Sequence, residues 1–134
     1  MAGTVERSVL LQYRMDRARD AIAEAEAMAQ LGHWNACVNR LYYACFYAVI
    51  AALLHRGLTS SKHSGARSLF GRHLVRPGAV PRELARVYND LFDSRQEADY
   101  QDLVRFEEAQ VRPWIAEAAR FVEHIDALIK APPP

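Results

Sequence analysis

The stretch WNACVNRLYYACFYAVIAALLH, residues 34–55, decides the fold of this chain. Apolar residues recur along it every three or four positions, which predicts a helix. Two apolar stripes lie side by side on that helix, formed by Val38, Leu41, Cys45, Val49 and Ala52 and by Tyr42, Phe46, Ile50 and Leu53. A helix with so little polar surface is packed by neighbours on several faces, so we expect it at the centre of the core. Its tyrosines Tyr42, Tyr43 and Tyr47 add hydroxyl groups that require hydrogen-bond partners.

Helical periodicity on either side of this stretch predicts four further helices. The segments 5–31 and 104–130 each carry an apolar stripe whose spacings alternate between four and three. Further helices are expected at 62–75, behind a serine N-cap, and from Pro81 to a point between 94 and 97. We therefore predict an all-α fold, an up-and-down antiparallel bundle of four long helices plus a short third helix, five in all. One domain is expected over residues 1–131, with a disordered tail at 132–134.

The composition indicates a cytoplasmic protein with its own core. Of its 134 residues 51% are apolar, enough to bury a core without disulfides or metals. The run from Leu41 to Leu54 is too short to span a bilayer, and the opening residues meet charge before any apolar stretch of signal length. On one helix, Cys37 and Cys45 stand about 12 Å apart, too far for a disulfide. The sequence shows no metal-binding or cofactor-binding motif, so we expect no membrane association, no metal and no cofactor.

The charges are separated along the chain. The net charge is +1, but no acidic residue occurs between Glu26 and Glu83, where the basic residues are Arg40, Arg56, Lys62, Arg67, Arg72, Arg76 and Arg82. The segments before and after this basic stretch are both net acidic. Such blocks predict a positive face that receives an anion. The alternative is that the blocks of opposite sign pair with each other across the bundle.

Three segments together resemble the HEPN family of small helical-bundle proteins. They are NRLYYACFYAVIAALL at 39–54, SSKHSGARSLFGRHLV at 60–75 and LFDSRQEADYQD at 91–102, and their order and spacing extend the resemblance over nearly the whole chain. The resemblance implies a homodimeric bundle whose active members are metal-independent ribonucleases. Many members are toxins encoded beside a small nucleotidyltransferase that acts as antitoxin, whereas others bind nucleotides or serve in larger complexes.

The active motif of the family is an arginine, four to six residues and then a histidine, at the end of a late helix. Arg95 matches the arginine, but the residue five positions on is Tyr100. Two residues beyond, where toxin members often have tyrosine, the chain has Asp102. The resemblance therefore implies a degenerate ribonuclease motif, with Arg95, Tyr100 and Asp99 as the catalytic candidates. If the chain is an enzyme, it is a metal-independent endoribonuclease.

These three side chains differ in how well they suit catalysis at neutral pH. Arg95 offers a planar fork to a phosphate oxygen. Tyrosine has a pKa near 10, which makes Tyr100 a poor base at neutral pH, and Asp99 acts as a base only if its pKa is raised. Residues five apart lie about 140° apart around a continuous helix, so Arg95 and Tyr100 meet only if the helix ends between them. The loss of apolar periodicity after Ser94 permits that end. Alternatively, Arg95 pairs with an acidic residue nearby or on the last helix, and Tyr100 caps a helix end.

The sequence predicts a phosphate-binding or nucleic-acid-binding set formed by Arg95, Asn39, Arg40, Lys62, His63 and Arg67. His63 also fits a polar surface residue near a helix start, and Asn39 also fits a buried polar contact. The apolar width of the second and fifth helices predicts a homodimer. One hypothesis is a toxin-like component of a toxin–antitoxin or defence pair that binds RNA or nucleotide at a dimer cleft. Its alternatives are a non-catalytic interaction module for a nucleotidyltransferase partner and a nucleotide-binding regulator.

Overall fold

The structure, a computed structural model, describes the backbone of residues 2–100 and 104–131 and the side chains of residues 5–98 and 104–131. Over these residues the chain forms helices and no strand. They are α1 (Ala2–Gln30), α2 (Trp34–His55), α3 (His63–Phe70), η1 (Gly71–Val75), α4 (Arg82–Tyr100) and α5 (Glu108–Lys130). The π-helical segment η1 follows α3 without a break, so the two act as one short helical segment. The predicted all-α class and its five helices are confirmed.

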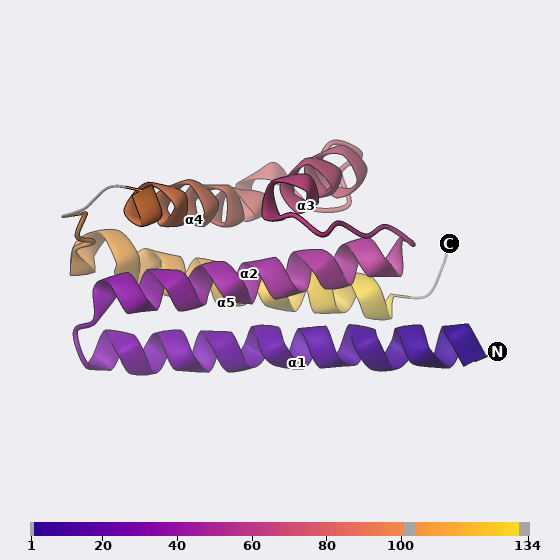
Figure 1. Ribbon diagram of the computed structural model, residues 1–134, viewed down its shortest axis with the longest axis horizontal. Coiled ribbons are helices and arrows are strands. Elements are labelled where there is room, and N and C mark those ends of the chain that lie inside the picture. The colour runs from indigo at the N-terminus through magenta and orange to yellow at the C-terminus, as the bar shows by residue number, and fades with distance from the viewer. Residues whose placement is uncertain (1, 101–103, 132–134) are drawn as a thin grey trace.

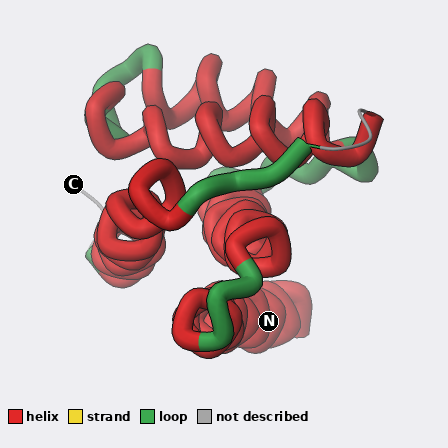
Figure 2. The backbone as a smooth tube through the Cα atoms, turned by 90° about the vertical axis from the view of Figure 1, so that its left-hand side faces the viewer, coloured by secondary structure: helices red, strands yellow, loops and turns green. Residues whose placement is uncertain are grey.

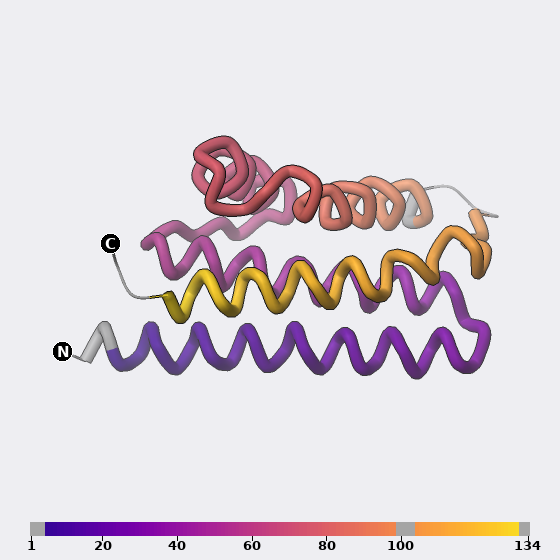
Figure 3. Tube along the Cα trace, turned by 180° about the vertical axis from the view of Figure 1, so that it is seen from behind, coloured from indigo at the N-terminus to yellow at the C-terminus, as the bar shows by residue number. Residues whose placement is uncertain are grey.

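The helices form three tiers. The helix α1 lies along one side, α2 and α5 lie in the middle, and α3 and α4 cover the opposite side of α2 (Figure 1). The chain runs in opposite directions in α1 and α2, and α5 runs in the direction of α2, behind it in Figure 1 and in front of it in Figure 3. Seen along these three helices, α4 lies across the bundle (Figure 2). The up-and-down arrangement that we expected for the long helices therefore holds for α1 and α2, whereas α4 crosses them.

The helix ends follow the glycines where the backbone must turn. Gly32 and Gly57 stand behind α1 and α2 with φ of 75° each, a left-handed conformation that ends a helix and that glycine adopts without strain. The bounds of α2 agree with the prediction. Those of α4 and α5 do not, because α4 continues to Tyr100 and α5 begins only at Glu108. Exposed polar residues can form a helix without any apolar periodicity. The loss of periodicity after Ser94 therefore did not mark the end of the helix.

The core is built around α2, which contacts α1, α3, α4 and α5. Alanines are buried on both α1 and α2, and small side chains let two helix axes approach closely; they are Ala18, Ala21, Ala25 and Ala29 on the one and Ala44, Ala48, Ala51 and Ala52 on the other. Cys37 and Cys45 are free and buried. By length and composition α2 could cross a bilayer, contrary to the estimate from its apolar run, but most of it is buried inside the protein. It is the core helix that the sequence predicted.

The apolar surface that remains exposed lies elsewhere than expected. The large apolar side chains that are exposed among the described residues all belong to α1 or follow it directly: Val5, Val9, Leu10, Tyr13 and Leu31. The apolar width of α2 is mostly covered within one chain. The reason that we gave for a dimer therefore does not hold for α2, and the first half of α1 takes its place as the exposed apolar surface.

A buried carboxylate joins the middle of α1 to the end of α5. Asp126 is 7% exposed and accepts hydrogen bonds from Arg19 and Lys130 at 2.9 Å each. Burial alone would raise the pKa of Asp126, but these two cations outweigh it and hold the pKa below the usual 3.8. The carboxylate therefore stabilises the fold in its charged form.

Replacing that carboxylate, Asp126→Asn, is expected to lower the free energy of unfolding by about 1–2 kcal/mol at neutral pH, because a buried charge-assisted pair is lost. The folded-state pKa is lowered, so this stabilisation is present above about pH 4 and disappears as the pH falls through the folded-state value. Urea unfolding at neutral and acid pH measures both effects. Glu123→Gln is the matched control, since Glu123 also pairs with Arg19 but its side chain is 61% exposed. An equal cost for the two variants would contradict the prediction.

Candidate functional site

Arg95 lies where α4 crosses α2, and its guanidinium rests on two tyrosines of α2. Its Nη2 donates a hydrogen bond of 3.1 Å to the hydroxyl oxygen of Tyr43. Its Cζ lies 4.8 Å from the centre of the Tyr42 ring and 5.1 Å from the centre of the Tyr43 ring. A cation against an aromatic face is attracted by the negative charge of the π-system. Two consecutive tyrosines thus hold the arginine of the motif in place.

A histidine from α3 packs against the same aromatic rings. The ring of His63 stacks on Phe46 with centres 4.1 Å apart and an interplanar angle of 3°. It meets the ring of Tyr43 edge-on, at 6.0 Å. Its Nδ1 lies 2.7 Å from the hydroxyl oxygen of the fully buried Tyr42. Burial and then the positive charge of Arg95 lower the pKa of His63 below 6.5. His63 therefore belongs to the Arg95 site and is no isolated surface residue.

The ring of Tyr43 also carries a second guanidinium. The Cζ of Arg40 lies 5.1 Å from the centre of that ring, so Arg40 and Arg95 both contact Tyr43. The Oδ1 of Asn39 accepts hydrogen bonds from Nε and Nη2 of Arg40, at 3.2 and 2.9 Å, which fixes the plane of the guanidinium. Arg40 also pairs with Glu24 of α1 at 3.4 Å. Asn39 is thus a positioning partner for Arg40, as its half-buried place on α2 allows.

Tyr47, the next tyrosine along α2, contacts an arginine of α1 in the same way. Nη2 of Arg17 donates to the hydroxyl oxygen of Tyr47 at 3.0 Å, and its Cζ lies 5.2 Å from the centre of that ring. With the contacts of Tyr42 and Tyr43, all three tyrosine hydroxyls of α2 have the partner that the sequence led us to expect. The three tyrosines with Phe46 form a face, here called the aromatic face, that extends from α1 to α4.

The other predicted residues lie around this face. Arg67 pairs with Asp93 at 2.8 Å and covers the ring of Phe92 at 4.0 Å, and Lys62 is the exposed N-cap residue of α3, beside His63. The ion pairs of Arg40 and Arg67 show that two charges of the basic stretch pair across helices. The exposed Arg72, Arg76 and Arg82 line a hollow with Arg67 outside α3 and η1. No ion pair of these three is seen among the described side chains, so this hollow keeps its positive charge.

The remaining catalytic candidates, Asp99 and Tyr100, have side chains outside the described part of the structure, and Asp102 lies outside it altogether. The backbone nevertheless corrects one expectation. Because α4 is continuous from Arg95 to Tyr100, the two positions lie about 140° apart around its axis. The helix end that would have brought them together is absent from this part of α4. Tyr42, Tyr43 and Phe46 were expected only as parts of the core helix, although hydroxyl groups on a buried helix indicate polar partners nearby.

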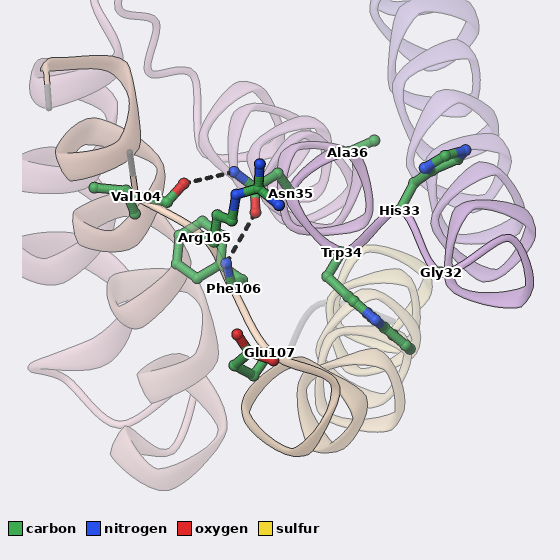
Figure 4. A pocket seen from close by; sticks show the side chains of 9 residues that line it. All are labelled: Gly32, His33, Trp34, Asn35, Ala36, Val104, Arg105, Phe106 and Glu107. Carbon is green, nitrogen blue, oxygen red and sulfur yellow. Dashed lines mark hydrogen bonds between the residues drawn. The ribbon is translucent and has the colours of Figure 1, made fainter. Parts of the chain in front are cut away.

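A second hollow lies at the other end of α2, where the chain enters α5. Figure 4 shows Asn35 between the two backbone groups that it binds, and Trp34 and Arg105 are among the residues that line the hollow. Asn35 Nδ2 donates to the carbonyl of Val104, and the backbone N–H of Phe106 donates to Asn35 Oδ1, each at 2.9 Å. Both polar atoms of the Asn35 amide are occupied by the backbone. Asn35 therefore anchors the segment before α5, and the hollow has a structural explanation.

Comparisons with known proteins agree with this architecture. The model of the HEPN domain matches residues 11–128. A UPF0332 protein of Thermotoga maritima is 41% identical over 93% of this chain and 95% of its own, and one of Gloeobacter violaceus is 38% identical over 81% and 87%. A protein of Methanocaldococcus jannaschii that is named as a candidate toxin is 26% identical over 75% of this chain and 68% of its own. The match covers all the helices that carry the Arg95 site. The chain belongs to the HEPN domain family.

Proposed function

We propose that this protein is a toxin-like HEPN component of a toxin–antitoxin or related defence pair, and that it binds RNA at the Arg95 site. The observation that carries the proposal is the pair of guanidinium groups, of Arg95 and Arg40, on the one half-buried ring of Tyr43. Each guanidinium lies 5.1 Å from the centre of that ring. A guanidinium matches the geometry of phosphate oxygens, so the site favours an anion. The relative from Methanocaldococcus jannaschii supports the toxin-like role.

RNA fits this surface better than a small anion does. Tyr43, Phe46 and Tyr47 are half-buried, so each exposes part of an aromatic side chain, and Tyr43 and Tyr47 each lie beside an arginine. Unpaired bases stack on such rings while arginines follow the backbone. The hollow of Arg67, Arg72, Arg76 and Arg82 extends the positive surface beyond the site. A single strand of RNA would thus find stacking partners in the half-buried rings and phosphate partners in the arginines.

A second copy of the chain is the proposed cover of the exposed apolar surface. Val5, Val9 and Tyr13 are 63%, 65% and 58% exposed and recur every four residues along α1. One further turn leads to Arg17, which contacts Tyr47 on the aromatic face. The apolar strip and the aromatic face are therefore continuous. A twofold dimer through this strip buries it and brings two Arg95 sites toward one groove.

The chemistry that this groove would serve is cleavage of RNA by its own 2′-hydroxyl group. The reaction needs a base for the 2′-hydroxyl proton, a proton for the leaving 5′-oxygen and positive charge at the phosphoryl oxygens. Arg95 supplies the charge, together with Arg40 on the same tyrosine ring. A partner with the fold of a nucleotidyltransferase would inhibit the protein by covering the same groove, and the protein is proposed to act in the cytoplasm.

The proposal is tested with 2′-O-methyl RNA, which binds but has no 2′-hydroxyl to attack. We expect the wild-type protein to sediment as a dimer and to bind this RNA with an affinity that falls steeply as salt rises. Tyr13→Arg places like charges against each other across the twofold axis, so it should give a monomer and weaken RNA binding about tenfold despite its added positive charge.

Leu31→Arg is the matched control, because Leu31 is 65% exposed at the opposite end of α1. It should leave the dimer and the affinity unchanged. A wild-type protein that binds no RNA would refute the proposed function. A monomeric wild type that binds RNA as well as Tyr13→Arg does would refute the shared groove alone.

A further inference from the structure

His63 is the one imidazole that the described residues place on the aromatic face, and the family motif does not account for it. It is the first residue of α3, far along the chain from the end of α4 where the motif has its histidine. Phe46 fixes the plane of its ring and Tyr42 fixes one ring nitrogen. A side chain held by both a stack and a hydrogen bond has a defined orientation, which proton transfer requires.

The orientation turns the second nitrogen outward. Nδ1 faces the hydroxyl of Tyr42, which is 0% exposed. The Nε2 atom lies across the five-membered ring from Nδ1, so it points away from the buried tyrosine. His63 itself is partly exposed, and the hydrogen bonds seen among the described residues include none from Nε2. This nitrogen therefore faces away from the buried tyrosine, on a ring that feels the charge of Arg95.

The electrostatic surroundings favour the neutral imidazole. Among the described side chains, the titratable and charged groups near His63 are Tyr42 and Tyr43 on α2, Arg95 on α4, Lys62 just before α3 and Arg67 within it, with Asp93 of α4 paired to Arg67. Burial and then the positive charge of Arg95 disfavour a second positive charge on the ring. A neutral imidazole at neutral pH has a lone pair that can accept a proton.

We propose that His63 is the proton-transfer residue of RNA cleavage at the Arg95 site, so that the imidazole comes from the start of α3 instead of the end of α4. This inference rests on the proposed function. Nε2 takes the proton of the 2′-hydroxyl, the 2′-oxygen forms a bond to phosphorus, and the bond from phosphorus to the 5′-oxygen breaks. The 5′-oxygen takes a proton from water, and the imidazolium gives its proton to the hydroxide so formed. The products are a 2′,3′-cyclic phosphate and a free 5′-hydroxyl.

Tyr42 has a defined part in this scheme. For Nε2 to carry the lone pair, Nδ1 must carry the proton and donate it to the hydroxyl oxygen of Tyr42, which can accept as well as donate. Burial raises the pKa of Tyr42, so its hydroxyl stays neutral throughout the reaction. The same Nδ1–H bond persists in the imidazolium. Tyr42 is thus a positioning residue that selects the reactive tautomer.

The test compares His63→Gln with His73→Gln, a matched change of a half-buried histidine in η1. Single-stranded RNA carrying 2′-hydroxyl groups reports cleavage, 2′-O-methyl RNA reports binding, and circular dichroism verifies the fold. We expect His63→Gln to bind like the wild type but to cleave about 100-fold more slowly or worse, which is the usual contribution of a general base. The His73→Gln variant should cleave like the wild type.

The pH profile gives a readout that a merely structural role would not change. In the wild type the cleavage rate should rise with pH through an apparent pKa below 6.5, and His63→Gln should lose this limb. Proton NMR of the wild type should give the same value for the His63 ring without RNA. Binding of 2′-O-methyl RNA should raise it, because a phosphate favours the imidazolium.

The outcomes separate the two proposals. A wild-type protein that binds no RNA refutes the proposed function and this inference together. A wild type that binds RNA but does not cleave it, or a His63→Gln variant that cleaves as fast as the wild type, overturns the role of His63 and leaves RNA binding intact. An inert wild type that gains cleavage only as Tyr100→His overturns it too, since the missing proton-transfer group would then belong to α4.

Discussion

Arg95→Ala is expected to slow RNA cleavage about 100- to 1,000-fold, the usual loss when a group that stabilises transition-state charge is removed. The reason is geometric as well as electrostatic. Tyr42 and Tyr43 hold the guanidinium on the aromatic face, so its fork meets a phosphate without first becoming ordered. Binding of 2′-O-methyl RNA should weaken roughly 10- to 100-fold, since a hydrogen bond to a charged group contributes about 1.5–3 kcal/mol.

Two further variants make this result specific. Arg95→Lys keeps the charge but loses the planar fork, so it should recover part of the binding and little of the cleavage. Arg105→Ala removes an exposed arginine beside the Asn35 hollow, outside the site, and should reduce affinity no more than a single distant charge does. Equal losses in Arg95→Ala and Arg105→Ala would mean that only net charge matters. Urea unfolding must accompany these measurements, because the tyrosine contacts of Arg95 also stabilise the fold.

Phe121→Ala is expected to lower the free energy of unfolding by about 3–5 kcal/mol, as other large-to-small changes in cores do. Phe121 of α5 is 0% exposed. Its ring centre lies 5.7 Å from that of Phe70 on α3 and 6.1 Å from that of Tyr88 on α4. The side chain thus joins three helices, and the cavity left by alanine cannot close unless all three move.

Chemical denaturation of Phe121→Ala and of Leu31→Ala measures this cost. Leu31 is 65% exposed, so the control should change the stability by less than about 0.5 kcal/mol. A loss below about 1 kcal/mol for Phe121→Ala would mean that α3 and α4 collapse onto α5 without strain. In that case the aromatic cluster would be looser than its ring distances indicate.

The periodicity of the sequence predicted the helices where an apolar stripe meets a clear stop. Gly32 and Gly57 bound α2, and the prediction for that helix agrees with the structure. The segment from Ser94 to Tyr100 has no such stripe, because most of the described residues there lie at the surface or only half-buried. Its helix was therefore predicted too short. Apolar periodicity in a sequence arises because one face of a helix is buried. An exposed helical turn therefore shows no such periodicity.

The site was predicted in its parts and not in its arrangement. Arg95 and His63 were both candidates, but they are 32 positions apart and come from different helices. Their neighbourhood depends on the angle at which α4 crosses α2 and on where α3 begins. Both are set by packing between distant segments, which no local pattern records. The two tyrosines that join them were visible only as groups in need of partners.

The hairpin of α1 and α2 has a consequence for how the protein is made. Its two helices pack closely through alanines and are joined by a short turn, so their contacts are local and should form early in folding. That hairpin already contains Tyr42, Tyr43 and Phe46. Arg95 follows 40 residues after the end of α2, and ribosomes deliver the chain from its N-terminus. A growing polypeptide thus carries an incomplete Arg95 site beside the translation machinery. The site gains the guanidinium of Arg95 only when synthesis is well past α3.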